Sequence, residues 1–370
     1  MERHPTRGRT VFAAIVVALS LVVTAIALGA CSRAYNYGSA AFSDGQHGWV
    51  SGCDPAKSKT VLTRTSDGGA TWVRVGARAT PKNTRVAGWA EFSTPTTGVW
   101  AVGPGSPLYT TTGGRPWTRA TTRDAHGVRT MSGSYYSAAS FATATVGWAT
   151  LVRGDVAHAG DSSGGFIVRT RDAGATWRIK KAVYGEKGDP SGGFCDVAAP
   201  TGRICYALRA GVRGGVYATV DTGVTWKRQL LPTDTTAYEA LEFVDATTGY
   251  AVGGAGMIAK TIDGGLTWTP QVSGTTERLH GVCFVDATHG WAVGEMGTIL
   301  VTQDGGADWA PQVSGWVPDP EVENDNMVIN DVEFVSATEG WAVVQIGWSP
   351  GQKGTLLHTT DGGVNWQMIH

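Results

Sequence analysis

Aspartates recur at a fixed place in a short repeated motif, and their carboxylates could do chemistry. They are Asp67, Asp172, Asp221, Asp263, Asp304 and Asp361. Paired carboxylates can hydrolyse glycosidic bonds, and clustered carboxylates can bind calcium. An Asp in a tight turn, however, usually accepts backbone N–H bonds. Each of these residues stands two positions after a Thr and two before a Gly. We therefore interpret all six as structural and predict no catalytic residue.

A second set of acidic residues alternates along the segment 314–330, namely Asp319, Glu321, Glu323 and Asp325. Their oxygens could bind calcium, but Asn324 and Asn330 stand where an EF-hand loop needs a Gly and a Glu. We interpret the segment as a solvated acidic loop. His158 and Asp161 lie in a Gly- and Ser-rich stretch that indicates flexibility rather than a metal site. We predict neither a metal nor a cofactor.

The aspartates belong to a motif that reads Thr-x-Asp-x-Gly-x-x-Trp, first seen from Thr65 to Trp72. A degenerate copy ending at Trp117 has Thr112 in place of the Asp and Pro116 before the Trp. The seven copies end at Trp72, Trp117, Trp177, Trp226, Trp268, Trp309 and Trp366. Periods of roughly 40–50 residues with short strands are typical of propeller blades. Gly allows the turn its positive φ, and we expect each Trp to be buried between sheets.

A second landmark precedes the motif: a strand that ends in Phe, a turn, and a Gly-aromatic-Ala-Val run, as in Phe284 followed by residues 290–293. Each repeat then supplies four short strands. The sequence predicts an all-β, seven-bladed propeller over residues 39–370, with four antiparallel strands per blade and the Asp motif between strands three and four. Blade one has its own first strand near Ser39. We therefore expect closure by packing of complete blades, without strand exchange between the termini.

The first thirty residues differ from the rest. Arg3, Arg7 and Arg9 precede an uncharged apolar run over residues 11–30, which is the pattern of an export signal. The run ends in Leu-Gly-Ala before Cys31, which resembles the lipobox of bacterial lipoproteins and implies lipidation of Cys31. We predict a signal peptide over residues 1–30 and a tether over 31–38. An uncleaved membrane anchor is the alternative. Both place the rest outside the cytoplasm.

Cysteine usage permits a disulfide in an exported chain. Cys195 and Cys205 flank a short Pro-Thr-Gly turn, so they could face each other on neighbouring strands. We predict a bond between them and none between Cys53 and Cys283. Because no Cys-x-x-Cys pair is present, zinc is not indicated.

Loop lengths predict a binding face. If four strands alternate in direction, the turns between strands one and two and the Asp motifs emerge on one face. The longer connections fall on the other, which we call the loop-rich face; they are 51–60, 153–165, 183–193, 314–330 and 346–354. Long loops gathered on a rigid scaffold often carry recognition.

Charge is divided along the chain. Residues 31–230 contain 24 Lys and Arg against 12 Asp and Glu, whereas residues 231–370 contain 3 against 18. Separated charges of opposite sign orient a protein partner. We predict that such a partner, associated with the membrane, docks on the loop-rich face of a monomer. The candidate binding residues are Arg123, Arg129, Arg153, Arg209 and Arg213. A nucleic-acid partner is not expected outside the cytoplasm.

The repeated motif resembles the Asp-box, or BNR repeat, of sialidases and related propellers. The copy at residues 241–253, followed by 261–268, is similar to the repeats of the photosystem II stability and assembly factor family. That resemblance implies a non-catalytic scaffold that binds another protein at a membrane through an arginine-rich patch; Arg is abundant in the first four blades here, but the motif does not assign individual positions to that patch. The alternative is a glycosidase or glycan-binding propeller. Sialidases carry an Arg-Ile-Pro motif, which this sequence lacks.

Overall fold

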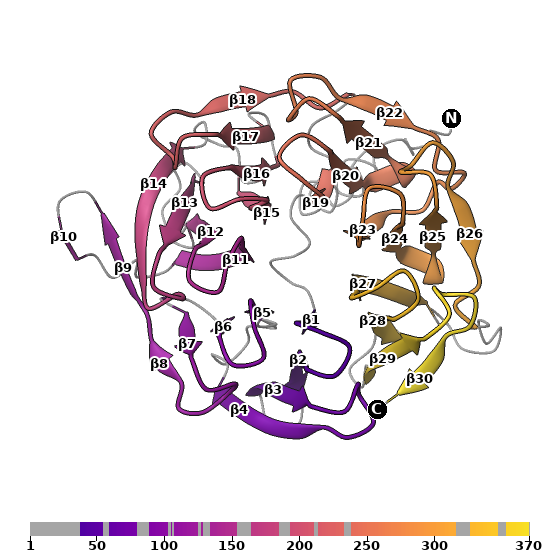
Figure 1. The fold of residues 1–370 in the computed structure, drawn as a ribbon, viewed down its shortest axis with the longest axis horizontal. Coiled ribbons are helices and arrows are strands. Elements are labelled where there is room, and N and C mark those ends of the chain that lie inside the picture. Colours follow the sequence, from indigo (N-terminus) through magenta and orange to yellow (C-terminus); the bar gives the residue numbers. More distant parts are fainter. Residues whose placement is uncertain are drawn as a thin grey trace, which may run out of the picture.

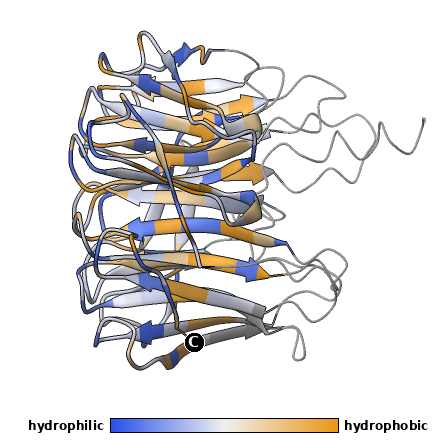
Figure 2. Cartoon of the chain, turned by 90° about the vertical axis from the view of Figure 1, so that its right-hand side faces the viewer, coloured by the Kyte–Doolittle hydropathy of each residue, from blue (hydrophilic) through white to orange (hydrophobic). Residues whose placement is uncertain are grey.

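Seven β-sheets are arranged as blades around a common axis (Figure 1). The computed structural model describes residues 38–54, 59–79, 89–102, 105, 107–124, 127–128, 134–153, 164–184, 193–210, 214–232, 238–315, 326–346 and 353–369. Seen from the side, the strands run across the thickness of a disc (Figure 2). Cys31 and the predicted signal peptide lie outside the described residues.

The strands of each blade follow one another in the chain. Blade one holds β1 (Ser39–Phe42), β2 (Gly48–Asp54), β3 (Lys59–Thr65) and β4 (Val73–Ala79), and blade two holds β5 (Trp89–Phe92), β6 (Gly98–Ala101), β7 (Leu108–Thr110) and β8 (Thr118–Arg119). Blade three holds β11 (Ser134–Phe141), β12 (Gly147–Arg153), β13 (Gly164–Thr170) and β14 (Thr176–Tyr184), and blade four holds β15 (Phe194–Ala198), β16 (Cys205–Arg209), β17 (Gly215–Thr219) and β18 (Lys227–Gln229).

The last three blades repeat this order. Blade five holds β19 (Tyr238–Phe243), β20 (Gly249–Gly253), β21 (Ile258–Thr261) and β22 (Thr269–Gln271). Blade six holds β23 (Leu279–Phe284), β24 (Gly290–Gly294), β25 (Ile299–Thr302) and β26 (Ala310–Gln312). Blade seven holds β27 (Met327–Phe334), β28 (Gly340–Ile346), β29 (Lys353–Thr359) and β30 (Gln367–Ile369). Two 3₁₀ turns, η2 (Gly254–Gly256) and η3 (Glu295–Gly297), link the second and third strands of blades five and six.

The predicted seven-bladed, all-β architecture is confirmed, with four antiparallel strands in six of the sheets. Blade three has two more, because β9 (Thr121–Asp124) and β10 (Gly127–Val128) extend its outer edge. β9 pairs in parallel with the start of β14, and the Thr121 N–H donates to the Ala175 carbonyl at 2.9 Å. The repeat pattern does not predict this addition, since it is built from the linker that leads into blade three.

The ring closes without strand exchange between the termini, as expected. β1 pairs with β2 in blade one, and β27 to β30 form blade seven alone. The Phe42 ring of blade one stacks on Trp341 of blade seven with centroids 3.7 Å apart. Closure therefore depends on side-chain packing between complete blades.

The same contact joins most neighbouring blades. An aromatic ring on the second strand of one blade stacks on the last Phe of the first strand of the next. The stacked pairs are Trp49–Phe92, Tyr206–Phe243, Tyr250–Phe284, Trp291–Phe334 and Trp341–Phe42, with centroids 3.5–3.8 Å apart. At each of these junctions the Trp of the next Asp-box meets the Phe edge-on. Each aromatic pair contributes roughly 0.5–1.5 kcal/mol beyond the burial of its area.

The Gly before the second-strand aromatic residue is required by packing within the blade. A Cβ at Gly290 would lie 2.4 Å from the ring of Phe284, and one at Gly340 would lie 2.4 Å from Phe334. The Phe ring lies directly over the Gly backbone. This explains why Gly and Phe recur together in the repeat.

The predicted Cys195–Cys205 disulfide is wrong, because Cys195 is disulfide-bonded while Cys205 and Cys283 are free and buried. Cys195 lies in the bulge between Phe194 and Asp196, and Asp196 pairs with Leu208. Cys205 is therefore several residues away along β16, on the order of 10 Å at ~3.3 Å per residue. A disulfide needs its two Cα atoms within roughly 7 Å.

We expect Gly290→Ala to destabilise the ring by about 1–3 kcal/mol, because the new methyl group displaces the Phe284 ring and its stack on Tyr250. The urea unfolding midpoint measures this effect. Gly52→Ala is the matched control, since a Cβ at Gly52 in β2 meets no atom within 4 Å. Equal midpoints for the two variants would contradict this account of the Gly–Phe pair.

Candidate binding surfaces

The Asp-box carboxylates are engaged within their own turns. Asp67 accepts hydrogen bonds from the hydroxyls of Thr65 at 2.7 Å and Thr71 at 2.5 Å, and from the Thr71 N–H at 2.8 Å. The Thr65 hydroxyl also accepts the Gly69 N–H at 2.9 Å. These bonds, led by the one from the Thr71 hydroxyl, lower the pKa of Asp67 to about 2. The box lies between β3 and β4 and holds that turn together.

Five further boxes repeat the Thr-to-Asp hydrogen bond at 2.8 Å, at Asp172, Asp221, Asp263, Asp304 and Asp361. In each, the backbone N–H four residues after the Asp also donates to the carboxylate. A carboxylate used in this way is a poor general acid or base. Blade two differs, since the hydroxyl of Thr112 there donates to the carbonyl of Arg115.

The box Trp residues are less buried than expected. Trp177 is fully buried and Trp268 and Trp309 nearly so, but Trp72, Trp117, Trp226 and Trp366 are half-buried. The residues buried between blades are the aromatic residues of the second strands, such as Trp148 and Trp341. We predicted burial of the box Trp because it is the residue that recurs at the end of every copy of the motif. The box Trp meets the Phe ring edge-on, and one side of its indole remains exposed at the outer edge of the ring of blades.

Most of the segments predicted to form the loop-rich face lie outside the described residues. The strand ends that flank them do emerge on one face, because strands alternate in direction in every blade. The acidic residues Asp319, Glu321, Glu323 and Asp325, and also His158 and Asp161, fall in these segments. Their expected roles remain predictions.

The predicted arginines do not form one surface among the described residues. Arg209 is fully buried, so it cannot be the exposed docking residue that the sequence predicted. The cause is that β16 extends through Arg209, which pairs with Phe194 and Gly215 inside the sheet. Arg123 is exposed, but it lies on β9 at the outer edge. The side chain of Arg153, and all of Arg129 and Arg213, are outside the described part.

Basic side chains gather instead on the outer strands of blades two to four. We call the basic rim the exposed residues Arg119 on β8, Arg123 on β9, Arg178 on β14, and Lys227 and Arg228 on β18. Arg123 and Arg178 are direct partners in the parallel pairing of β9 and β14. In the described part of the chain, none of the five forms an ion pair.

The charge of the basic rim is concentrated near β14. Burial lowers the pKa of Lys180, and the neighbouring charges of Arg169, Arg171 and Arg178 lower it further. By contrast, the outer strands β22, β26 and β30 of blades five to seven contain no charged residue. The rim is therefore cationic on one side of the ring and neutral on the other.

The acidic residues of the innermost strands face a cavity at the axis of about 290 Å³, the central channel. Glu91, Asp196, Glu242, Asp331 and Glu333 line it, and no basic side chain is among its described lining residues. Burial in the channel raises the pKa of Glu91 to about 8, and the charges of Asp331 and Asp196 add to the shift. Burial and the charges of Glu91, Asp331 and Glu242 hold the pKa of Glu333 well above its usual range.

A polar network that the repeat does not signal joins blades five and six near the loop-rich face. His280 Nδ1 lies 2.8 Å from Glu239 Oε2, and its Nε2 lies 3.7 Å from Glu295 Oε1. The guanidinium of Arg278 contacts both carboxylates. Burial opposes protonation of His280, but its hydrogen bonds to Glu239 and Glu295 raise its pKa. Because His280 and Glu239 are nearly fully buried, this network acts as a joint between blades.

The described part of the chain offers neither a candidate metal site nor a helix that could cross a membrane. No three His, Cys, Asp or Glu side chains there are grouped as a metal site would need. No helix in that part is long and apolar enough to cross a membrane.

We expect Glu91→Gln to stabilise the protein at pH 8 by on the order of 2–4 kcal/mol and to leave its stability at pH 4 nearly unchanged. The pKa of Glu91 is about 8 in the ring, above the usual 4.5. Between these values the unfolded chain releases a proton that the folded ring retains. The stability of the parent must therefore fall as pH rises through this window.

Urea unfolding of both proteins at pH 4, 6 and 8 measures this slope. Glu277→Gln, outside the channel, serves as the control. A slope that is the same for the parent and Glu91→Gln would show that Glu91 is ionised in the folded ring at neutral pH.

Comparison with known proteins agrees with this architecture. The family model of the Photosynthesis system II assembly factor YCF48 matches residues 271–370, which include blades six and seven. A structure of YCF48 bound to a D1 peptide is 19% identical and has a TM-score of 0.57, covering 88% of this chain and 97% of that chain. YCF48 from Cyanidioschyzon merolae is 18% identical with a TM-score of 0.51, covering 75% of this chain and 83% of that chain.

A GH74 xyloglucanase from Xanthomonas campestris is 16% identical over 90% of this chain and 54% of its own, and its TM-score of 0.43 is too low to bear on activity. No curated protein sequence matches the chain significantly. The chain is thus a seven-bladed propeller that is similar to the YCF48 family in sequence over residues 271–370 and to YCF48 structures in fold.

Proposed function

We propose that this chain is a non-catalytic scaffold that binds a protein partner at a membrane through the basic rim, in the manner of an assembly factor. The observation that carries the proposal is the rim itself. Five exposed cations without an ion-pair partner in the described part of the chain lie on three adjacent blades, and the opposite outer strands are uncharged. Such an asymmetric surface orients an acidic partner more than it adds affinity.

Two further observations support a binding role. A propeller of the same fold has been solved with a peptide of another protein bound to it. The carboxylates of the Asp-boxes are used within their own turns, so the repeated acidic residues are not available for hydrolysis. A binding scaffold needs a rigid ring and an exposed charged surface, and both are present.

The proposal includes export and a lipid anchor at Cys31. About seven residues separate Cys31 from β1, which span roughly 25 Å when fully extended. β1 begins on the loop-rich face, so a lipid at Cys31 would hold this face towards the bilayer. The basic rim would then be perpendicular to the membrane plane, where it could contact the extramembrane part of a membrane protein.

Charge reversal on the rim tests the partner. We expect Arg178→Glu with Lys227→Glu to reduce cross-linked recovery of a specific protein from native membranes by about tenfold or more at low salt. The loss should diminish as salt is raised, because the rim charges are exposed. Thr269→Glu is the control for introducing a carboxylate, since Thr269 stands at the place in blade five that Lys227 occupies in blade four.

Equal recovery of a partner with the parent and all variants would show that the basic rim does not bind it. Turnover of a glycan by the purified parent, with no protein captured, would instead establish the enzyme alternative.

The anchor is tested separately with Cys31→Ala. We expect the parent to partition into the detergent phase and the variant into the aqueous phase, or to accumulate with its leader still attached. Identical partitioning and identical mass of the two mature chains would contradict lipidation.

A further inference from the structure

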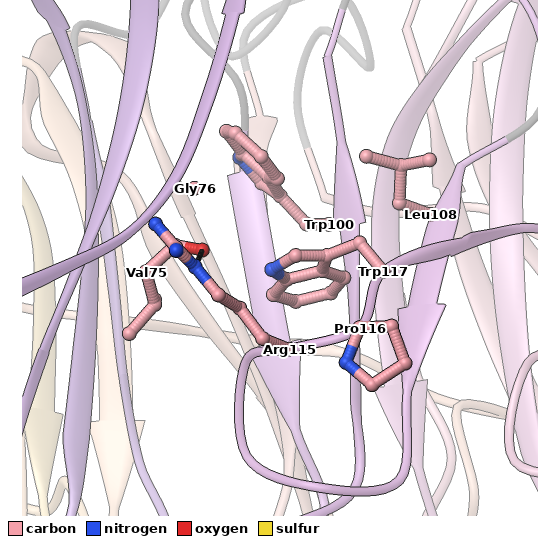
Figure 3. A pocket seen from close by; sticks show the side chains of 7 residues that line it. All are labelled: Val75, Gly76, Trp100, Leu108, Arg115, Pro116 and Trp117. Carbon is pink, nitrogen blue, oxygen red and sulfur yellow. Dashed lines mark hydrogen bonds between the residues drawn. The ribbon is translucent and has the colours of Figure 1, made fainter.

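A groove of about 640 Å³ lies between the outer strand of blade one and the degenerate box of blade two. Val75 and Gly76 line it from β4, Trp100 and Leu108 from β6 and β7, and Arg115, Pro116 and Trp117 from the box. Figure 3 shows the Arg115 side chain extended towards Val75, with Trp117 next to Trp100 and Pro116. The centroids of Trp100 and Trp117 are 5.7 Å apart. The groove is apolar, and among its described lining residues the Arg115 guanidinium is the one cation at its edge.

The groove arises where blade two departs from the repeat. In five of the other boxes the residue before the Trp donates a hydrogen bond from its side chain to the box Asp, as Thr71 and Thr176 do. In blade two this residue is Pro116, so an apolar ring replaces the hydrogen bond. The residue before it is Ala70 in blade one and Ala175 in blade three, but Arg115 here.

Blade one departs from the repeat on the facing side. The third residue after the box Trp is Gln229 in blade four and Gln312 in blade six, and each donates to a Gly carbonyl of the next box, at 2.7 and 2.9 Å. The equivalent residue in blade one is Val75, which cannot form that bond. Instead the Arg115 Nε donates to the Val75 carbonyl at 3.2 Å. The Gln-to-Gly hydrogen bond between blades is thus replaced by one from Arg115, and the apolar Val75 side chain lines the groove.

The strand beside the groove has an open edge. β4 is the outermost strand of its sheet. Its pairing with β3 contains a bulge at Val75, two residues after Val73, where the pairing begins. The pairing of β14 with β13 in blade three has the same bulge, two residues after Arg178. In blade three that edge is occupied, because β9 adds to it and the Thr121 N–H bonds the Ala175 carbonyl. Ala70 is the equivalent residue in blade one, and among the described residues no strand adds there.

We infer that an extended segment of a partner protein adds as a strand to the edge of β4 at the exit of its box, inserts an apolar side chain into the groove, and places a carboxylate on Arg115. This rests on the proposed function and names a second contact of the same scaffold. The position of β9 in blade three is the template for the added strand. Side chains alternate across a strand, so every second residue of the segment lies on the side of blade two.

The chemistry of the groove fits such a segment. The Arg115 side chain is exposed, and its described bond uses only Nε, which leaves the two terminal nitrogens for a bidentate carboxylate. Val73 is 64% exposed at the start of β4, so it can cover an apolar residue of the incoming strand. Strand addition gives affinity through the main chain, while the groove selects the side chain.

A phage-displayed library of random twelve-residue peptides tests this inference. The bait is the purified ring, and the variants are Val75→Lys and Arg115→Ala. Val75→Lys introduces the residue type of Lys180, which is at the equivalent position of blade three, and Arg115→Ala introduces that of Ala175. Both variants should therefore fold. Arg203→Ala, which removes an exposed cation outside both the groove and the basic rim, is the control.

We expect the parent and Arg203→Ala to enrich peptides in which an acidic residue lies near an apolar one. Enrichment of these peptides should fall at least tenfold on Val75→Lys and on Arg115→Ala. N-methylation of alternate backbone amides in a synthetic copy should abolish its binding, because an N-methyl amide cannot donate to the edge.

Equal enrichment on all baits, no enrichment on the parent, or binding that survives N-methylation at every position would overturn the inference. If the library fails but rim charge reversal still releases a membrane partner, the inference falls and the scaffold function stands. If neither assay yields a protein ligand, the scaffold function falls as well.

Discussion

Stacking of an aromatic ring from one blade on a Phe of the next is the interaction on which the ring depends. It is present at five of the junctions, including the one that joins Trp341 to Phe42 and closes the ring without a shared strand. Blades three and four are joined by an edge-on contact of Trp148 with Trp226, and between blades two and three the Trp89 Nε1 donates to the Tyr136 carbonyl at 2.7 Å. Because the stack uses the inner strands, the outer strands are free to vary. The surfaces that could bind a partner are found there.

Much of the fold could be predicted because it is encoded locally and repeated. The Asp-box fixes a turn through bonds that span four residues, and its seven copies determine the number of blades. The strand addition by β9, the burial of Arg209 and the true state of Cys195 could not be predicted. They depend on where a strand ends and where a bulge shifts the register, as between Phe194 and Asp196, and these features leave no periodic signal.

The charge division seen along the sequence also has a radial component in the fold. Basic residues lie on the outer strands of blades two to four, while the carboxylates of blades two, four, five and seven meet at the axis. The radial component could not be predicted, because the sequence contains no information on which strand is innermost. Because the pKa values of Glu91 and Glu333 are raised in the channel, the folding stability of the ring falls as pH rises. The charges of the basic rim are exposed and lie outside this core.

The central claim is that this ring recognises protein through its outer edge. Hydrogen exchange of the ring, alone and with its captured partner, tests it most directly. The account predicts slowed exchange at the outer edges of β8, β9, β14 and β18, with the inner strands unchanged. Slowed exchange confined to the ends of the strands on the loop-rich face, with these outer edges unaffected, would contradict it.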